Sequence, residues 1–177
     1  MSEGAAAQPG RRRGALSLLW VAALMLNGCL GYRLGTTLPP GIRTAFVPTV
    51  VNATGEPRLE AETTRAIIEE LQRDGTLRIA DEQTADAVLD VELTGFSLVP
   101  LRYEEDQARM TQEYRMVIRA SVTFRRSSDG EVLVRQDVRG RATFEPSGDL
   151  ALEKRETIPG AARDLAREVV RSVVEYW

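Results

Sequence analysis

The chain has 177 residues, 43% of them hydrophobic and 28% charged, a composition typical of one globular domain with its own core. Its formal charge of −3 excludes a globally basic protein that coats nucleic acid, so we expect no nucleic-acid partner. Histidine is absent, which removes the commonest general base, the commonest zinc ligand and every nucleophile pair that uses histidine. These absences weigh against hydrolase chemistry.

The first 28 residues have the pattern of a bacterial signal peptide. The basic run Arg11–Arg13 precedes the apolar stretch Ala15–Leu26, which is too short to span a hydrocarbon core of about 30 Å as a helix. This stretch ends in Leu26-Asn27-Gly28-Cys29, which resembles the lipobox of bacterial lipoproteins. The resemblance implies that residues 1–28 are removed and that Cys29 is acylated as the first residue of the mature chain.

Cys29 has an alternative interpretation as a buried free thiol, since free cysteines behave as small hydrophobic residues. The basic run, the short apolar stretch, Gly28 and the cysteine occur together, and this combination favours the lipid anchor. Acyl chains contribute about 0.8 kcal/mol per buried methylene, so two or three of them hold a protein permanently on a membrane. Leu30 is not the aspartate that retains many enterobacterial lipoproteins in the inner membrane, which favours the outer membrane.

The mature chain is predicted to start with a lipidated tether over residues 29–41 and to continue as a single domain over residues 42–177. Without residues 1–28 it has 20 basic and 25 acidic residues, a net charge of −5. Ile42–Val51 is rich in β-branched residues and is predicted to be a strand. Because proline cannot donate a ladder hydrogen bond, we expect this strand at a sheet edge or with a bulge at Pro48.

A helix is predicted next, over Arg58–Asp74, where apolar side chains recur at helical spacing and Gly75 ends the pattern. Leu77–Ala80 is short and extended. Ala87–Val99 alternates apolar and polar residues as a strand does, and its apolar phase shifts past Gly95, which predicts a β-bulge.

A long hairpin is predicted after these elements. Glu113–Arg125 has the clearest alternation in the chain, and Glu131–Phe144 alternates in the same way beyond a Ser127–Gly130 turn. Glu145–Glu156 is expected to be a polar loop, and Thr157–Trp177 a helix with Pro159 in its first turn.

The predicted fold is therefore an α+β two-layer sandwich of order β-α-β-β-β-α. We expect a mostly antiparallel four-stranded sheet with two amphipathic helices on one face, because each helix has only one apolar side. The other face of the sheet is then wet or covered by a partner.

Three stretches of the chain resemble the LptE family of lipopolysaccharide-assembly lipoproteins: CLGYRLG, LPPGIRTAFVPTVVNATGEPRLEAETTRAI and ADAVLDVELTGFSLVP. The resemblance covers nearly the whole mature chain. It implies a domain at the periplasmic face of the outer membrane that fills the lumen of an LptD-type β-barrel and helps to deliver lipopolysaccharide. A lipoprotein that regulates another envelope machine, such as a peptidoglycan synthase or a secretion channel, is the alternative.

An enzyme would need a paired acid and base, and the carboxylates here lie on helix exteriors and turns. We therefore expect no catalytic residues, no metal and no cofactor. The tip Pro100–Gln112 is longer than a usual hairpin connection, which indicates either a functional or a flexible loop. Its acidic triplet Glu104–Asp106 lacks the spacing of a calcium loop.

Arginines cluster on the strand faces that point away from the predicted core. Guanidinium groups bind phosphate through two parallel hydrogen bonds, so this face could hold the phosphorylated sugar of lipid A. The competing interpretation is a solvated face on which Asp90, Glu92, Glu113 and Asp137 neutralise the arginines across the strands. The candidate phosphate contacts are Arg115, Arg119, Arg135, Arg139 and Arg141, with Arg125 on the same face.

Overall fold

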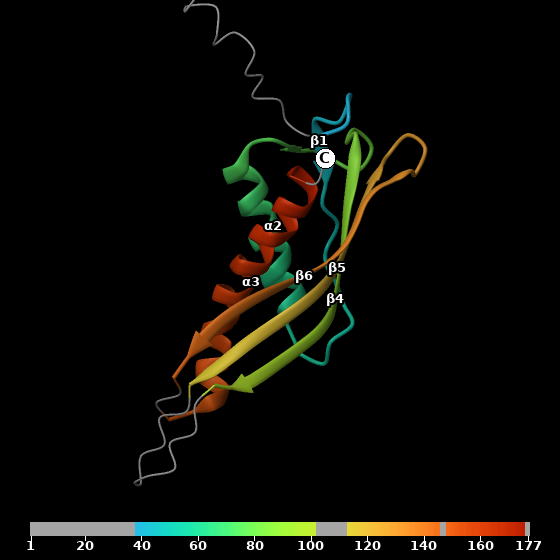
Figure 1. The fold of residues 1–177 in the computed structure, drawn as a ribbon. Helices are drawn as coiled ribbons and strands as arrows, with labels where there is room; N and C mark the ends of the chain where they lie inside the picture. The colour runs from blue at the N-terminus through green and yellow to red at the C-terminus, as the bar shows by residue number, and fades with distance from the viewer. Residues whose placement is uncertain (1–37, 102–112, 146–147, 176–177) are drawn as a thin grey trace, which may run out of the picture. The chain divides into compact units, whose positions relative to one another are not determined.

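The computed structural model describes residues 38–101, 113–145 and 148–175 (Figure 1). In chain order the elements are β1 (Thr44–Phe46), β2 (Val51–Asn52), α2 (Leu59–Asp74), β3 (Arg78–Ile79), β4 (Ala87–Pro100), β5 (Tyr114–Arg126), β6 (Val132–Phe144) and α3 (Leu150–Val174). They form a mixed sheet with two helices packed on it, which confirms the predicted α+β class. Cys29 and most of the tip Pro100–Gln112 lie outside the described residues.

The sheet has six strands in the order β3-β1-β4-β5-β6, with β2 also pairing with β4. The long strands β4, β5 and β6 pair antiparallel, while β1 and β2 run parallel to β4, and β3 parallel to β1. This sheet has more strands than the four expected. The predicted strand Ile42–Val51 divides around Pro48 into β1 and β2, and Leu77–Ala80 contains β3. The parallel pairs arise because α2 returns the chain to the same end of the sheet before β3 begins.

The bulge predicted in β4 is present at Thr94. Leu93 pairs with Ala120 and Gly95 pairs with Arg119, so one residue of β4 has no partner on β5. Beyond this extra residue, Phe96 lies on the side of the sheet that faces the helices. The shift in the apolar–polar alternation past Gly95 predicted this change of side.

The second helix begins earlier than expected. Residues 150–156 were predicted to be a loop, and this was wrong: α3 starts at Leu150, where the Asp149 carboxylate accepts hydrogen bonds from the backbone N–H groups of Ala151 and Leu152. Pro159 therefore lies inside the helix and not in its first turn. A proline inside a helix costs about 3 kcal/mol, and the buried stripe of α3 offsets this cost.

The core lies between the sheet and the two helices, which Figure 1 shows on the same side of the strands. Alternate residues of β5 are fully buried there, from Met116 to Phe124. Gly140 lets α3 lie directly on β6, because a Cβ at this position would be 2.4 Å from the carbonyl oxygen of Ala161. Among the described residues, the fully buried core lies within positions 42–173.

Among the helices of the described residues, none combines the length and the apolar character needed to cross a membrane.

Candidate functional site: an arginine face on the open side of the sheet

The register of the long strands places all five candidate arginines on one face of the sheet. Ile118 and Ala120 of β5 are buried against the helices, so Arg119 between them points to the opposite side. Arg119 lies directly opposite Arg139 on β6, and the other arginines occupy the same set of alternating positions. We call this surface the arginine face: Arg115, Arg119, Arg135, Arg139 and Arg141, all exposed.

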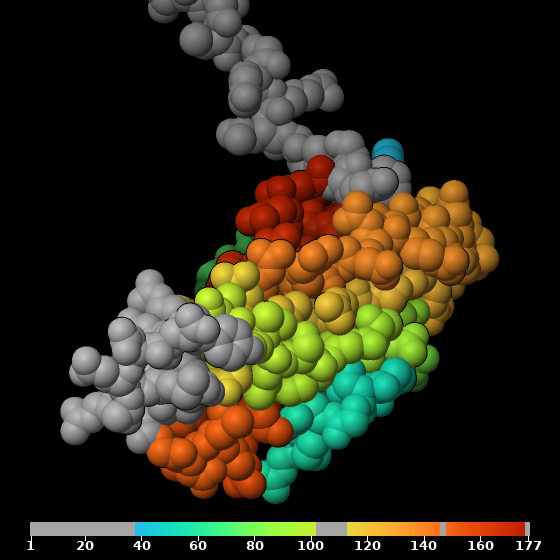
Figure 2. Space-filling view, turned by 60° about the horizontal axis from the view of Figure 1, so that its bottom comes forward, coloured from blue at the N-terminus to red at the C-terminus, as the bar shows by residue number. Residues whose placement is uncertain are grey.

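No helix covers this face in the described structure. In Figure 2 the atoms of β4, β5 and β6 run side by side as yellow-green, yellow and orange bands across one surface of the molecule. The sequence-based expectation that the five arginines share one face therefore agrees with the register, because an antiparallel pair keeps directly opposite side chains on the same side.

Arg119 and Arg139 form a like-charged pair. Directly opposite residues in an antiparallel pair have Cβ atoms about 5 Å apart, and like charges directly opposite each other are unfavourable in a sheet. In this structure the Arg119 guanidinium lies over Gly95 of β4, on the side of β5 away from Arg139. Within the described residues, neither guanidinium group makes a hydrogen bond or an ion pair.

Cross-strand neutralisation is present at a sixth arginine. Arg125 Nε donates to Asp90 Oδ2 at 2.8 Å, between β5 and β4. Both side chains are about 40% exposed, so this ion pair contributes at most about 1 kcal/mol. In the described part of the chain, Glu92 and Asp137 lie on the same face without an ion pair to any of the five arginines.

Gly95 also belongs to this site. The sequence pattern linked it only with the predicted β-bulge. A Cβ on Gly95 would lie 3.3 Å from Nη1 of Arg119, so the guanidinium group extends over the bare backbone of β4. A glycine inside a strand often marks such a close approach, and that signal was available in the sequence.

A groove adjoins the arginine face where the sheet ends at β6. Its volume is about 620 Å³, and it lies between the outer edge of β6 and the C-terminal half of α3. Arg139 and Arg141 line it from the strand, and Glu168, Arg171 and Glu175 line it from the helix. The sequence pattern did not predict this groove, because it depends on how α3 crosses the sheet edge.

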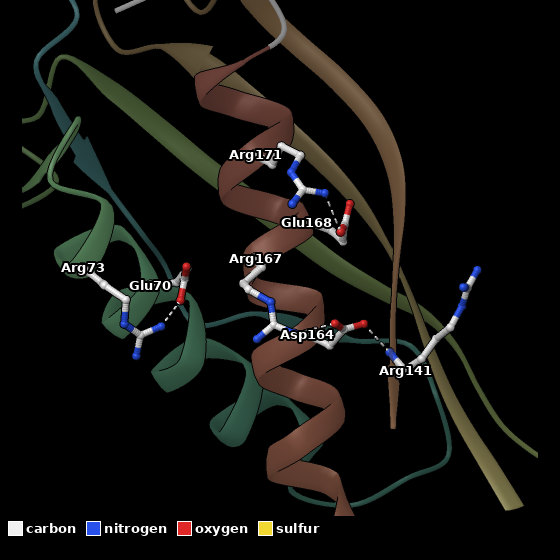
Figure 3. A network of polar contacts seen from close by, with 7 residues as sticks. All are labelled: Glu70, Arg73, Arg141, Asp164, Arg167, Glu168 and Arg171. Carbon is white, nitrogen blue, oxygen red and sulfur yellow. Dashed lines mark hydrogen bonds and ion pairs between the residues drawn. The ribbon is translucent and has the colours of Figure 1, made fainter. Parts of the chain in front are cut away.

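One residue of α3 closes part of that edge. The backbone N–H of Arg141 donates to Oδ2 of Asp164 at 2.8 Å, and Asp164 Oδ1 accepts from Arg167 at 2.6 Å (Figure 3). Figure 3 shows the Arg141 side chain directed away from this contact. The helix therefore satisfies a backbone donor of β6 and leaves the Arg141 guanidinium group available on the arginine face.

A metal site is not part of this arrangement. Across residues 38–101, 113–145 and 148–175, no three or more Cys, Asp or Glu side chains are grouped closely enough to hold a metal ion.

The fold is that of a small α+β domain with two helices on one face of a mixed sheet and an open, arginine-bearing opposite face. The chain belongs to the LptE lipopolysaccharide-assembly family, whose family model matches residues 42–175. This confirms the resemblance seen in the sequence and makes the protein a non-enzymatic assembly lipoprotein.

Solved structures show the same fold at low sequence identity. The hypothetical protein CT253 from Chlamydia trachomatis is 12% identical with a TM-score of 0.55, over 76% of this chain and 97% of that chain. Uncharacterized lipoprotein B from Nitrosomonas europaea is 13% identical with a TM-score of 0.54, over 83% and 92% of the two chains. Protein XCC0632 from Xanthomonas campestris is 14% identical with a TM-score of 0.52, over 80% and 91%. No curated protein matches the sequence significantly.

Proposed function

We propose that this protein is anchored through Cys29 to the periplasmic face of the outer membrane, where it fills and supports an LptD-type β-barrel and binds lipopolysaccharide on its arginine face. Membership of the LptE family supports the role in lipopolysaccharide assembly. The basic run, apolar stretch and cysteine at the N-terminus support the anchor. The barrel partner follows from the family resemblance.

The observation that carries the lipid contact is the pair of Arg119 and Arg139 without a neutralising acid. With the Arg119 side chain turned from Gly95 of β4 toward Arg139, a phosphate over these strands would accept charge-assisted hydrogen bonds from both guanidinium groups, each contributing about 1.5–3 kcal/mol. An anion there would also neutralise two cationic groups of neighbouring strands that have no ion pair within the described residues. Both effects favour an anionic ligand over a neutral one.

The spacing of the arginines suits a ligand with more than one phosphate. Arg115 and Arg119 are four residues apart on β5, which corresponds to about 13 Å along the strand. Arg139 and Arg141 flank the same stretch from β6, opposite Arg119 and Val117. Four positive charges therefore lie within the footprint of one phosphorylated sugar headgroup, in a mature chain whose net charge is −5.

The test replaces Arg119 and Arg139 together with glutamine, which keeps much of the side-chain length and removes both charges. We expect binding of purified lipopolysaccharide to fall by about tenfold, and wild-type binding to weaken with added salt. The melting temperature and co-purification with the barrel should stay nearly unchanged. A matched control replaces Arg65 and Arg167, which lie on helix exteriors in i,i+3 ion pairs, with glutamine.

Two results would contradict parts of the proposal. Wild-type binding by the Arg119→Gln/Arg139→Gln variant would make the arginine face a solvated surface. Loss of the barrel complex with folding intact would assign these arginines to the protein interface, and the lipid contact there would be wrong.

A further inference from the structure

Charge divides the open face of the sheet into two parts. Residues that lie opposite one another on β4, β5 and β6 form rows across the three strands, and the strand register gives the members of each row. One row consists of Glu92, Ser121 and Asp137, so it carries two acids and no arginine. We call it the acidic row. The next row toward the end of β6 consists of Gly95, Arg119 and Arg139.

Beyond the acidic row, the described strands carry four arginines and no acid on the open face. We call this part the cationic patch: Arg115, Arg119, Arg139 and Arg141. Its rows span about 13 Å along the strands, and the three strands are together about 10 Å wide. Glu113 and Glu145 lie immediately outside β5 and β6 at the far end of the patch. Acids therefore limit the cationic patch at both ends.

On the other side of the acidic row, charges of both signs are mixed. Arg125 forms its ion pair with Asp90 there. Arg135 lies two residues from Asp137 on the same strand, which is about 7 Å. Within the described residues, neither Glu92 nor Asp137 makes an ion pair. Their negative charges therefore act on any ligand that approaches this part of the open face.

We propose that Glu92 and Asp137 are specificity-determining residues of the arginine face, because they confine its ligand to a compact group of phosphates over the cationic patch. An anion that extends past Arg119 and Arg139 meets both carboxylates, and like charges repel it. A phosphorylated headgroup about 13 Å long ends before the acidic row. This inference rests on the proposed function, since it concerns the same surface, and it excludes Arg135 from the phosphate contacts.

The distances make the repulsion selective for long ligands. A phosphate over the cationic patch is about 7 Å or more from the acidic row, close to the Debye length of about 10 Å at 0.1 M salt, so it is repelled weakly. A phosphate directly over the acidic row would lie about 4 Å from a carboxylate, where repulsion in water reduces binding about fivefold for each charge. A compact ligand avoids this second position, and an extended polyanion cannot.

The first test compares two probes on the purified full chain in detergent: lipopolysaccharide as the compact ligand and long-chain inorganic polyphosphate as the extended one. In Glu92→Gln/Asp137→Asn we expect binding of polyphosphate to rise about tenfold and binding of lipopolysaccharide only about twofold. The matched control is Glu69→Gln/Glu156→Gln, which removes two exposed negative charges from the helices on the other side of the sheet. It should change neither affinity by more than about twofold.

The second test compares two exposed arginines of β6 that lie on opposite sides of the acidic row. Arg141→Gln removes a charge of the cationic patch and should weaken lipopolysaccharide binding about fivefold. Arg135→Gln makes the same chemical change on the same strand and face, and it should leave lipopolysaccharide binding unchanged. In the Glu92→Gln/Asp137→Asn background, Arg135→Gln should lower polyphosphate binding, because the long anion then reaches this arginine.

Two outcomes would overturn the inference and leave the proposed function intact. One is an equal gain for both probes in Glu92→Gln/Asp137→Asn, and the other is a loss with Arg135→Gln as large as that with Arg141→Gln. In both cases the proposed lipid contact stands if lipopolysaccharide binding still depends on Arg119 and Arg139. If lipopolysaccharide binding survives Arg119→Gln/Arg139→Gln, the proposed lipid contact is wrong, and the polyphosphate measurements alone decide whether the acidic row restricts long anions.

Discussion

Thr44 and Asp86 join the starts of β1 and β4 by reciprocal hydrogen bonds. The Thr44 hydroxyl donates to Asp86 Oδ2 at 2.8 Å and accepts from the Asp86 backbone N–H at 2.9 Å. The same carboxylate oxygen accepts from the backbone N–H groups of Arg43 and Thr44 at 2.9 Å each. These bonds, first that from the Arg43 backbone and then that from the Thr44 side chain, lower the pKa of Asp86 below its usual value of 3.8.

This contact predicts a pH-dependent contribution to stability. Because the folded pKa of Asp86 is lowered, its contribution is fully present above pH 3.8 and is lost as the pH falls through the folded pKa. Asp86→Asn should therefore cost about 1 kcal/mol at pH 7 and progressively less below pH 3.8. Denaturant unfolding of both proteins from pH 7 to pH 2.5 measures the difference. Asp81→Asn, a neighbouring exposed aspartate, is the control, and a constant difference at all pH values would contradict the prediction.

A second prediction concerns the contact of β6 with α3. In Gly140→Ala the new methyl group would lie 2.4 Å from the Ala161 carbonyl oxygen and 2.5 Å from Cβ of Leu165, so α3 must move away from the sheet. We expect a loss of about 3 kcal/mol in the free energy of unfolding. Gly55→Ala is the control, because no atom lies within 4 Å of a Cβ at that position. Equal stability of the two variants would show that α3 does not rest on Gly140.

The long strands and α2 were predictable because their side chains alternate or repeat with one clear period. Met116 to Phe124 of β5 are buried at every second position, as the sequence indicated. The parallel pairs of β1 and β2 were not predictable, since both strands are too short for a period and their partners are distant in the chain. The start of α3 was not predictable from Pro159, which is common in the first turn of a helix but lies inside this one, whereas Asp149 supplies the N-cap.

The arginine face was predictable for the same reason as the strands, because every second residue of a strand lies on the same side of the sheet. Which arginines lie opposite each other was not predictable. That Arg119 lies opposite Arg139, and not opposite an acid, depends on the hairpin register, which shifts by one residue between Phe124 and Arg125. The groove beside β6 depends on the angle at which α3 crosses the edge of the sheet. This angle cannot be predicted from the local sequence of either element.

A third prediction compares two neighbouring threonines of α2. Thr63 is fully buried, and its hydroxyl has no hydrogen-bond partner within the described residues. Thr63→Val should therefore stabilise the protein by about 1 kcal/mol, because an unpaired buried hydroxyl carries a desolvation cost. The hydroxyl of Thr64 accepts from the Val50 backbone N–H at 3.0 Å and donates to the Glu60 carbonyl at 2.7 Å.

Thr64→Val makes the same chemical change one residue along the helix and should destabilise the protein by about 1 kcal/mol. The two substitutions have the same effect on helix propensity, so their difference reports on hydrogen bonding alone. Thermal unfolding measured in one buffer gives both values. A loss of stability in Thr63→Val would mean that its hydroxyl finds a partner such as buried water.

The last prediction tests the anchor. Cys29→Ser removes the sulfur atom that acylation requires, so the variant should lose labelling by radioactive palmitate and should leave the membrane fraction. Its melting temperature should match that of a delipidated wild type, because the buried core of the described residues lies within positions 42–173. Cells without the barrel partner provide the stricter measurement, since a partner could hold the variant at the membrane indirectly. If Cys29→Ser still fractionates with the membrane in those cells, a surface other than the lipid anchor attaches the protein, and the interpretation of Cys29 as a buried thiol gains support.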